Sequence, residues 1–245
     1  MRPSTISGRT RVFAAGVIGT LAILGGCDTK DAPDTEPKKS PGSSILDGEN
    51  TAQSNESAGD LVTRYEQAAA DAAETSPEDA QAFLASAETL KEIQAVVSPY
   101  ESTIKDFMSL GGLDANTIND ETQFERRISL VKGLIRTNDR MATELPPLIA
   151  RLEASSDPAK LALKLELLDR LRQADRSMYQ SMLGYLTILQ QTWDMYGVDE
   201  EGSIQFSPDV EQPLIAEFNE YAANIQAMAG EQAKLQEAIG MLERP

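Results

Sequence analysis

Apolar side chains recur at intervals of three and four residues through almost all of the chain from residue 58 to residue 245. This interval aligns side chains on one face of an α-helix, whereas a strand requires an alternation of apolar and polar residues that no segment sustains. The body of the protein is therefore predicted to be helical. The predicted core positions are, in chain order, Phe83, Ala87, Leu90, Ile93, Val97, Tyr100, Ile104, Phe107, Phe124, Ile128, Val131, Ile135, Met141, Leu145, Leu148, Leu152, Leu167, Leu171, Ala174, Met178, Met182, Tyr185, Leu189, Trp193, Tyr196, Leu214, Phe218, Tyr221, Ile225, Met228, Leu235, Ile239 and Leu242.

Local signals mark the ends of the first two long helices. Ser76 is placed to cap a helix that begins with Pro77, a residue favoured at the first helical position. The glycine pair at 111–112 is expected to end this helix, and Asp120 is expected to cap the next one. Upstream of both, the alanine-rich residues 58–75 can form a helix of their own.

The third helix is predicted to begin within SSDP at 155–158 and to continue to about Tyr196. The fourth begins within residues 209–213, and its apolar spacing alternates between four and three, which is the period of a left-handed coiled coil. Pro99 is expected to kink the first long helix, and the proline pair at 146–147 to bend or split the second.

Long sequential helices with short connections favour antiparallel neighbours. We therefore predict an all-α fold, an elongated up-down four-helix bundle with long and partly kinked helices over residues 58–245. An alternative architecture is a set of extended helical hairpins that complete their core in an oligomer.

The amino terminus has a different pattern. Residues 1–11 contain three arginines and no acidic residue, and residues 12–24 are apolar and uncharged. This apolar run is too short to cross a bilayer of about 30 Å, but it fits the apolar region of a secretory signal peptide. The run is followed by the only cysteine of the chain, Cys27.

The sequence LGGC at 24–27 resembles the lipobox of bacterial lipoproteins, which has leucine three positions before the cysteine and small residues between them. The resemblance covers residues 1–27 only, and it implies that residues 1–26 are a cleaved signal peptide. It also implies that Cys27 carries a thioether-linked diacylglycerol, with fatty acids such as palmitate, that anchors the protein in the bilayer.

Asp28 follows the lipobox cysteine directly. In enterobacterial lipoproteins an aspartate at this position is associated with retention in the inner membrane. We therefore expect an exported protein that is anchored on the periplasmic side of a bacterial membrane, with a preference for the inner membrane.

Residues 28–57 are rich in proline, serine and charged residues and nearly free of large apolar side chains. Such a segment buries too little apolar surface to fold, so a disordered tether is predicted, with a root-mean-square span of about 30 Å. The chain is thus divided into a signal peptide (1–26), a lipidated cysteine with its tether (27–57) and a helical bundle domain (58–245).

The composition disfavours several classes of site. The chain has no histidine, and acylation of Cys27 would remove its only thiol, so the usual general base and thiolate nucleophile are missing. Removal of residues 1–26 changes the net charge from −17 to −20, because this segment holds three arginines and no acidic residue. A body this acidic repels nucleic acid. We expect no catalytic residues, no cofactor and no metal.

Two acidic segments have the wrong spacing for a calcium site. If Gly202 is aligned with the turn glycine of an EF-hand, Gly197 and Pro208 occupy positions that need an acidic residue and a glutamate. Residues 194–206 are therefore predicted to form a small hairpin with an acidic tip. Residues 113–121 fail the same comparison and are interpreted as turn and N-cap chemistry.

Asn138 and Gln232 are polar residues on otherwise apolar stripes of two different helices. One interpretation is that buried amides control helix register, and the other is a polar ligand pocket in the bundle interior. The first is favoured. Met178 and Met182, four residues apart, are interpreted as core residues rather than as a soft-metal site.

These features together predict a lipid-anchored cell-envelope bundle that acts as a protein-interaction or structural module and is not an enzyme. The expected contacts are the bilayer, through acylated Cys27, and one or more envelope proteins. The alternative is a ligand-binding or sensory bundle with a small pocket around Asn138 or Gln232. A glycoside hydrolase is disfavoured, because no carboxylate pair stands out and aromatic residues are only 5% of the chain.

Overall fold

A computed structural model describes residues 58–74, 76–154, 157–199 and 203–243. The α-helices of this part are α2 (Ala58–Ala72), α3 (Pro77–Ser109), α4 (Glu121–Leu152), α5 (Pro158–Gln191) and α6 (Gln212–Glu243). Two short 3₁₀ helices, η2 (Ala115–Thr117) and η3 (Trp193–Met195), and two short strands, β1 (Tyr196–Val198) and β2 (Ile204–Phe206), complete it. The predicted signal peptide, lipobox, Cys27, Asp28 and tether lie outside the described residues.

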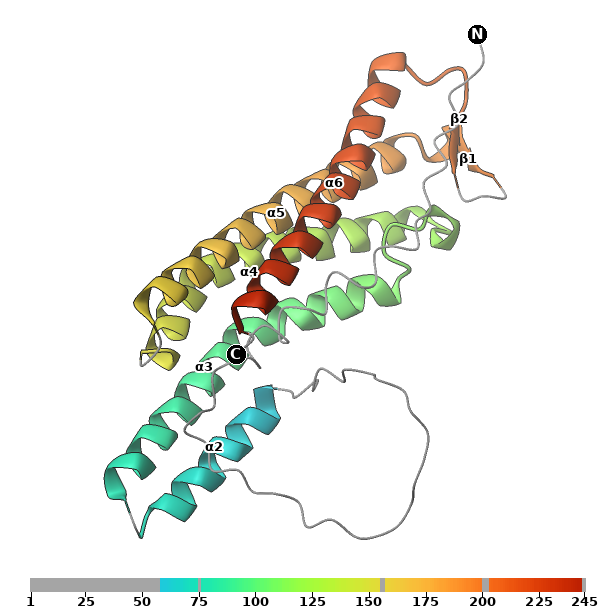
Figure 1. Ribbon diagram of the computed structural model, residues 1–245. Coiled ribbons are helices and arrows are strands. Elements are labelled where there is room, and N and C mark those ends of the chain that lie inside the picture. The colour runs from blue at the N-terminus through green and yellow to red at the C-terminus, as the bar shows by residue number, and fades with distance from the viewer. Residues whose placement is uncertain (1–57, 75, 155–156, 200–202, 244–245) are drawn as a thin grey trace, which may run out of the picture.

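The predicted all-α helical bundle is confirmed. Each long helix packs against the helix that follows it in the sequence, from α2 to α6 (Figure 1). The alanine-rich segment forms a separate helix, α2, in addition to the four long helices that the apolar stripes predicted.

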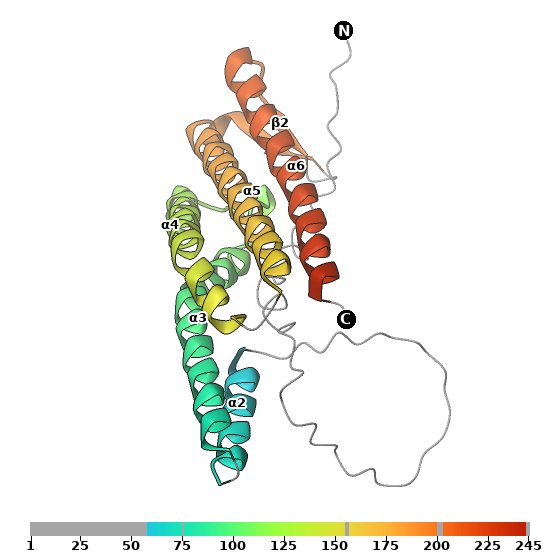
Figure 2. The ribbon, with the colours of Figure 1, turned by 60° about the vertical axis from the view of Figure 1, so that its left-hand side comes forward.

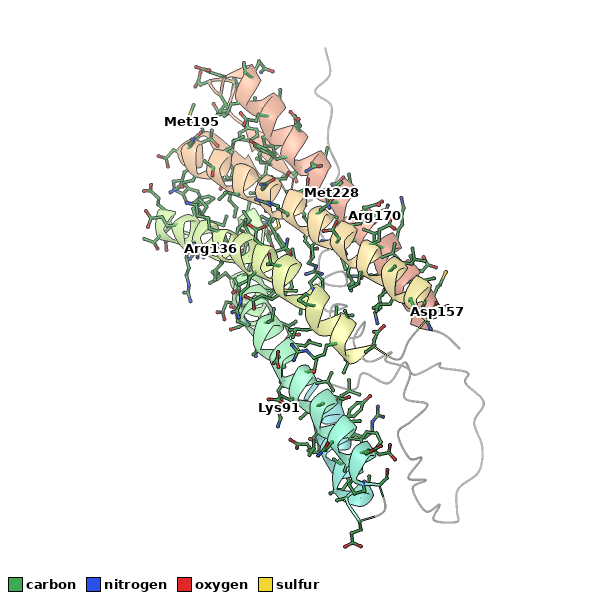
Figure 3. All side chains as sticks on the ribbon, turned by 90° about the vertical axis from the view of Figure 1, so that its left-hand side faces the viewer. Lys91, Arg136, Asp157, Arg170, Met195 and Met228 are labelled. Atoms are coloured by element: carbon green, nitrogen blue, oxygen red, sulfur yellow. The ribbon has the colours of Figure 1, made fainter. Side chains whose placement is uncertain are left out.

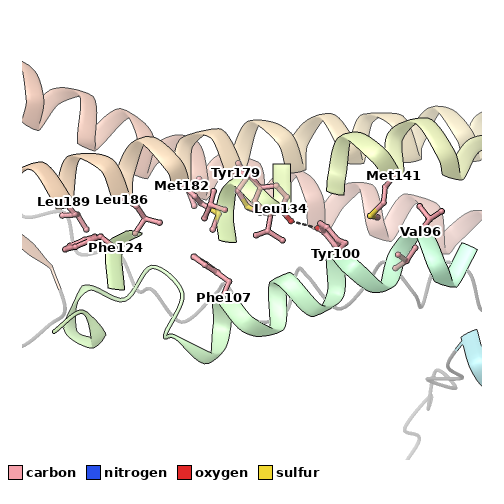
Figure 4. Packing of buried hydrophobic residues seen from close by; sticks show 14 of the residues in the cluster. Val96, Tyr100, Phe107, Phe124, Leu134, Met141, Tyr179, Met182, Leu186 and Leu189 are labelled. Atoms are coloured by element: carbon pink, nitrogen blue, oxygen red, sulfur yellow. Dashed lines mark hydrogen bonds between the residues drawn. The ribbon is translucent and has the colours of Figure 1, made fainter. Parts of the chain in front are cut away.

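The main core lies between α3, α4, α5 and α6. It contains Phe124, Leu134, Met141, Leu186 and Leu189, which are all almost fully buried (Figure 4). The paired methionines of α5, Met178 and Met182, are buried in the same cluster, which confirms their predicted core role. A second cluster joins α5 to the carboxyl-terminal half of α6 and comprises Leu167, Leu171, Ala174, Leu235 and Ile239.

Aspartate caps start two of the helices. The Asp120 carboxylate accepts a hydrogen bond from the Gln123 amide at 3.1 Å, and the Asp157 carboxylate accepts one from the Ala159 amide at 2.9 Å. Ser76 occupies the cap position before Pro77, but its hydroxyl makes no cap hydrogen bond. The cap predicted at Asp120 is thus confirmed. Ser76 is the residue that precedes the helix, as predicted, but its side chain does not stabilise the first turn.

The glycine pair predicted to end the first long helix does so. Helix α3 ends at Ser109, and Gly111 and Gly112 follow with φ angles of 89° and 60°. These left-handed conformations favour glycine. At Gly111 a Cβ atom would also clash with the Thr117 hydroxyl oxygen, so the loop leaves no room for a side chain at this position.

The prolines do not divide the helices. Pro99 lies inside α3, and the pair at 146–147 lies inside α4, which continues to Leu152. The proline pair was expected to bend or split the second long helix, and the split does not occur, because the backbone on both sides of the pair stays helical. Figures 1 and 2 show that α3 changes direction along its length, and the missing amide of Pro99 provides a cause for such a bend.

The third long helix is shorter than its apolar stripe predicted. Helix α5 ends at Gln191 rather than near Tyr196, and η3 and the β1–β2 hairpin follow, with Tyr196 paired to Phe206. The Thr192 amide and hydroxyl both donate to the Ile188 carbonyl oxygen, at 3.0 and 2.7 Å, which closes the last turn of the helix. Trp193 and Tyr196 still pack against the core, which is why the apolar spacing predicted a longer helix. The hairpin predicted over 194–206 is confirmed.

One end of the molecule is an extended arm, residues 58–92. Here α2 packs on the first half of α3 through a small core of Leu61, Val62 and Leu90. The arm extends beyond the ends of the other helices (Figures 1 and 2). Figure 3 shows Lys91 of the arm and Met195, next to the hairpin, toward opposite ends of the molecule.

Candidate functional site

Asn138 of α4 and Gln232 of α6 are both buried, with 1% and 3% of their surface exposed. The Asn138 side-chain amide donates to the Arg172 carbonyl oxygen at 2.8 Å, and the Gln232 amide donates to the Asp175 carboxylate. The two polar positions that the sequence singled out therefore reach the same turn of α5 from opposite neighbouring helices.

Arg172 and Asp175 form an ion pair inside the bundle. Their closest atoms, Nη1 and Oδ2, are 3.1 Å apart, and both side chains are about 95% buried. The Arg172 guanidinium also donates to the Asn138 side-chain oxygen at 3.4 Å. A buried ion pair of this kind has a large desolvation cost, so its main effect is to make any arrangement that separates the partners unfavourable.

Two tyrosines extend the polar contacts to α3. The hydroxyls of Tyr100 on α3 and Tyr179 on α5 share a hydrogen bond (Figure 4). The Arg172 guanidinium lies 5.7 Å from the centre of the Tyr100 ring, within the range of a cation–π interaction. We call the connected residues the polar network: Tyr100, Asn138, Arg172, Asp175, Tyr179 and Gln232.

Burial dominates the electrostatics of the polar network. It raises the pKa of Asp175, and the Arg172 charge and the Gln232 hydrogen bond oppose this shift. Burial also raises the pKa of Tyr100 and of Tyr179 above the ordinary tyrosine value, so both phenols stay neutral at physiological pH. The network thus holds one cation, one titratable carboxylate and neutral hydrogen-bonding groups.

The geometry of the polar network favours a role in helix register. The Asn138 and Gln232 amides are both directed to groups of α5, and the network contacts all four helices of the main core. A one-turn slip of α4 or α6 along α5 would leave the Arg172–Asp175 pair without these amides, at a cost of about 1–3 kcal/mol for each buried group left unpaired.

Sequence reasoning found Tyr100 as a core position and Asn138 and Gln232 as polar positions, but it missed Arg172 and Asp175. Both charged residues lie one position after the stripe residues Leu171 and Ala174. Two signals pointed to them. Buried amides need partners, and opposite charges three residues apart on a helix can pair beside an apolar stripe.

The aspartates of the two acidic segments accept hydrogen bonds within their own loops. The Asp114 carboxylate accepts from the Asn116 amide at 3.0 Å at the start of η2, which confirms the turn and cap chemistry predicted for 113–121. In the hairpin, the Asp199 carboxylate accepts from the Ser203 amide at 2.8 Å and from the Gln205 side chain at 3.1 Å. Across the described ranges, no group of three or more acidic side chains is placed to hold a metal ion.

Comparison with protein-family models, with curated proteins and with solved structures found no match to this chain. Of the helices in the described ranges, none has both the length and the apolar character that a membrane span requires. The function must therefore be inferred from the chemistry and geometry of this chain.

Proposed function

We propose that this protein is a lipid-anchored cell-envelope bundle whose arm binds an envelope protein. Support for the anchor comes from the sequence, in which Cys27 ends a lipobox-like LGGC after a signal-peptide pattern. Support for a binding role comes from the chain's composition, which has no histidine, and from its long, mutually packed helices. The arm is the observation that carries the proposal.

The arm presents an acidic surface away from the rest of the bundle. Residues 58–92 contain eight acidic and two basic residues. Lys91 is paired with Glu66 at 2.6 Å, whereas Glu78 and Glu88 are exposed and make no ion pair with another described residue. This excess of negative charge attracts a basic surface, and it speeds encounter most strongly at low salt.

The arm also exposes one large apolar side chain. Leu84 is 53% exposed on the same helix as Glu78 and Glu88. Interfaces combine apolar contacts at their centre with polar groups at their rim. The partner that fits the arm is therefore a protein with a basic surface and a small apolar patch.

The binding proposal is tested by photocrosslinking in cells. A benzophenone amino acid at position 84 should yield one discrete crosslinked product, whereas the same probe at Met241, which is 56% exposed on α6, should not. The variant Glu78→Lys with Glu88→Lys should abolish the product. The matched variant Glu220→Lys with Glu237→Lys, which makes the same charge change at exposed sites on α6, should retain it. Equal products from both probe positions, or an unaffected arm variant, would contradict the proposal.

The anchor is tested separately through Cys27. Replacement by alanine should abolish incorporation of labelled palmitate and release the protein from the membrane fraction, because the acyl chains provide the anchoring free energy. The control is Asp28→Asn, which keeps the acceptor thiol and should keep the label. A change in its distribution between the inner and outer membranes is expected if Asp28 directs retention.

A further inference from the structure

Arg127 is the largest fully buried side chain at the hairpin end of the molecule. It lies on the first turns of α4 and has no accessible surface. Its Nη2 atom donates to the Leu110 carbonyl oxygen and to the Thr117 hydroxyl, the latter at 2.7 Å. One nitrogen of the guanidinium thus ties the α3–α4 loop to α4.

The rest of the Arg127 guanidinium is unpaired within the described part of the chain. Its Nε and Nη1 atoms have no hydrogen-bond partner there, and no described carboxylate lies within ion-pair distance. The acidic residue that most influences its charge is Asp114, whose carboxylate already accepts from the Asn116 amide. Arginine remains protonated in proteins, so this is a buried cation with unused donors.

A second unpaired polar group lies at the same end of the molecule. The Tyr196 hydroxyl is buried and has no hydrogen-bond partner among the described residues. Tyr196 lies close enough to Arg127 for the arginine charge to lower its pKa, although burial has the larger effect and raises that pKa to about 12. The guanidinium nitrogens only donate, whereas the hydroxyl can both donate and accept, and neither group is hydrogen-bonded to the other through these atoms.

A chain of aromatic contacts joins Tyr196 to α4, the helix that carries the buried arginine. Trp193 contacts Phe124 and Tyr196 edge to face, with ring centres 5.3 and 6.0 Å apart. The ring of Phe206 contacts that of Phe218, with ring centres 5.0 Å apart. The hairpin has only three residues in each strand, and such a pair is marginally stable alone, so these ring contacts hold it against α4 and α6.

We propose that Arg127 and Tyr196 bind the carboxylate of a small monocarboxylic acid, whose apolar part packs among the rings of the hairpin end. A carboxylate is an acceptor with two oxygens and can satisfy both groups, and a bond to a charged group is about twice as strong as a neutral one. The nearby Asp114 charge disfavours a second negative charge on the ligand. Monoanions should therefore bind better than sulfate or phosphate.

Trp193 makes this site directly observable, because it is the only tryptophan of the chain. The probes are propionate and propionamide, which have a similar shape and differ in charge, added to the purified full-length protein at constant ionic strength. Propionate should change the fluorescence of Trp193 saturably and raise the melting temperature. Propionamide should do neither, and sulfate should bind more weakly than propionate.

The variant Tyr196→Phe removes only the hydroxyl and keeps the ring. It should weaken propionate binding about tenfold, the loss expected for one hydrogen bond to a charged group. The control Tyr221→Phe removes a hydroxyl that donates to Glu217 on α6, and it should leave binding unchanged. Arg127→Lys, which keeps the charge, should also weaken binding. Absence of a saturable signal, equal responses to propionate and propionamide, or wild-type affinity in Tyr196→Phe would overturn the proposal.

Discussion

Two arginines are buried in the described part of this bundle, and their surroundings differ. Arg172, in the middle of α5, faces Asp175 at 3.1 Å and the Asn138 side chain, with the Tyr100 ring beside it. Arg127, at the hairpin end, contacts neutral oxygens of one loop and has no described carboxylate within ion-pair distance. Both side chains are at least 95% buried.

This difference indicates that Arg172 is a structural residue and that Arg127 is a candidate for binding an anion. The groups that contact Arg172 come from three helices, α3, α4 and α5, and they include its counter-charge, so its effect is on stability and register. No carboxylate of the described residues is paired with the Arg127 charge, so this charge is available to stabilise a bound anion. The four predictions below test this comparison, from the largest expected effect to the smallest.

Removal of the Asp175 carboxylate should have the largest effect. Asp175→Ala leaves the Arg172 charge buried without its partner, and the free energy of unfolding in urea should fall by about 3–5 kcal/mol. The double variant Arg172→Met with Asp175→Leu removes both charges and should regain most of that loss. A double variant as unstable as the single one would show that the pair is not the source of the effect.

Removal of Arg127 should cost less, although it is equally buried. Arg127→Met leaves no charge unpaired, but the Leu110 and Thr117 oxygens lose their donor, so a loss of about 2 kcal/mol is expected. The same urea titration measures it. If this variant loses as much stability as Asp175→Ala, the distinction between the two arginines fails.

Removal of the Gln232 amide should lower the free energy of unfolding by less. In Gln232→Leu the Asp175 carboxylate loses one donor but keeps Arg172, and the expected loss is about 1.5 kcal/mol. Gln226→Leu, an exposed change on the same helix, is the control and should be near neutral. A ligand pocket around Gln232 would be indicated instead if Gln232→Leu abolished a ligand-induced rise in melting temperature without lowering the stability of the free protein.

The pH dependence should be the smallest effect. The folded-state pKa of Asp175 is raised by burial, so the folded protein holds this proton more tightly than the unfolded chain. The resulting stabilisation is present below the ordinary aspartate pKa near 3.8 and is lost as the pH rises through the folded-state value. Relative to Asp175→Asn, the wild type should therefore lose about 1.4 kcal/mol of stability for each unit by which the pKa is raised. Urea titrations between pH 4 and pH 7 measure this difference, and an increase with pH would contradict it.

Much of the fold could be predicted from the sequence, because helical periodicity is a local property. The stripes located the four long helices, the glycine pair ended α3, and Asp120 capped α4. The end of α5 was mispredicted, because Trp193 and Tyr196 contact the core from a non-helical backbone at positions that continue the helical spacing.

The candidate sites were predicted in part. Asn138 and Gln232 stood out because a polar residue on an apolar stripe is conspicuous in the sequence itself. Arg172 and Asp175 did not, because they lie beside the stripe, where charged residues are usually solvated. Arg127 was missed for the same reason, since it lies between the stripe residues Phe124 and Ile128.

The sequence by itself determined the helical class, the helix start at the Asp120 cap and the two polar positions in the bundle interior, since each depends on residues close together in the chain. The tertiary structure alone decided which groups those amides contact, and it brought Tyr196 into the electrostatic range of Arg127. Burial and pairing depend on segments that are distant in sequence. Two arginines of the same chemistry therefore acquire different roles from the helices, loop and hairpin that pack around them.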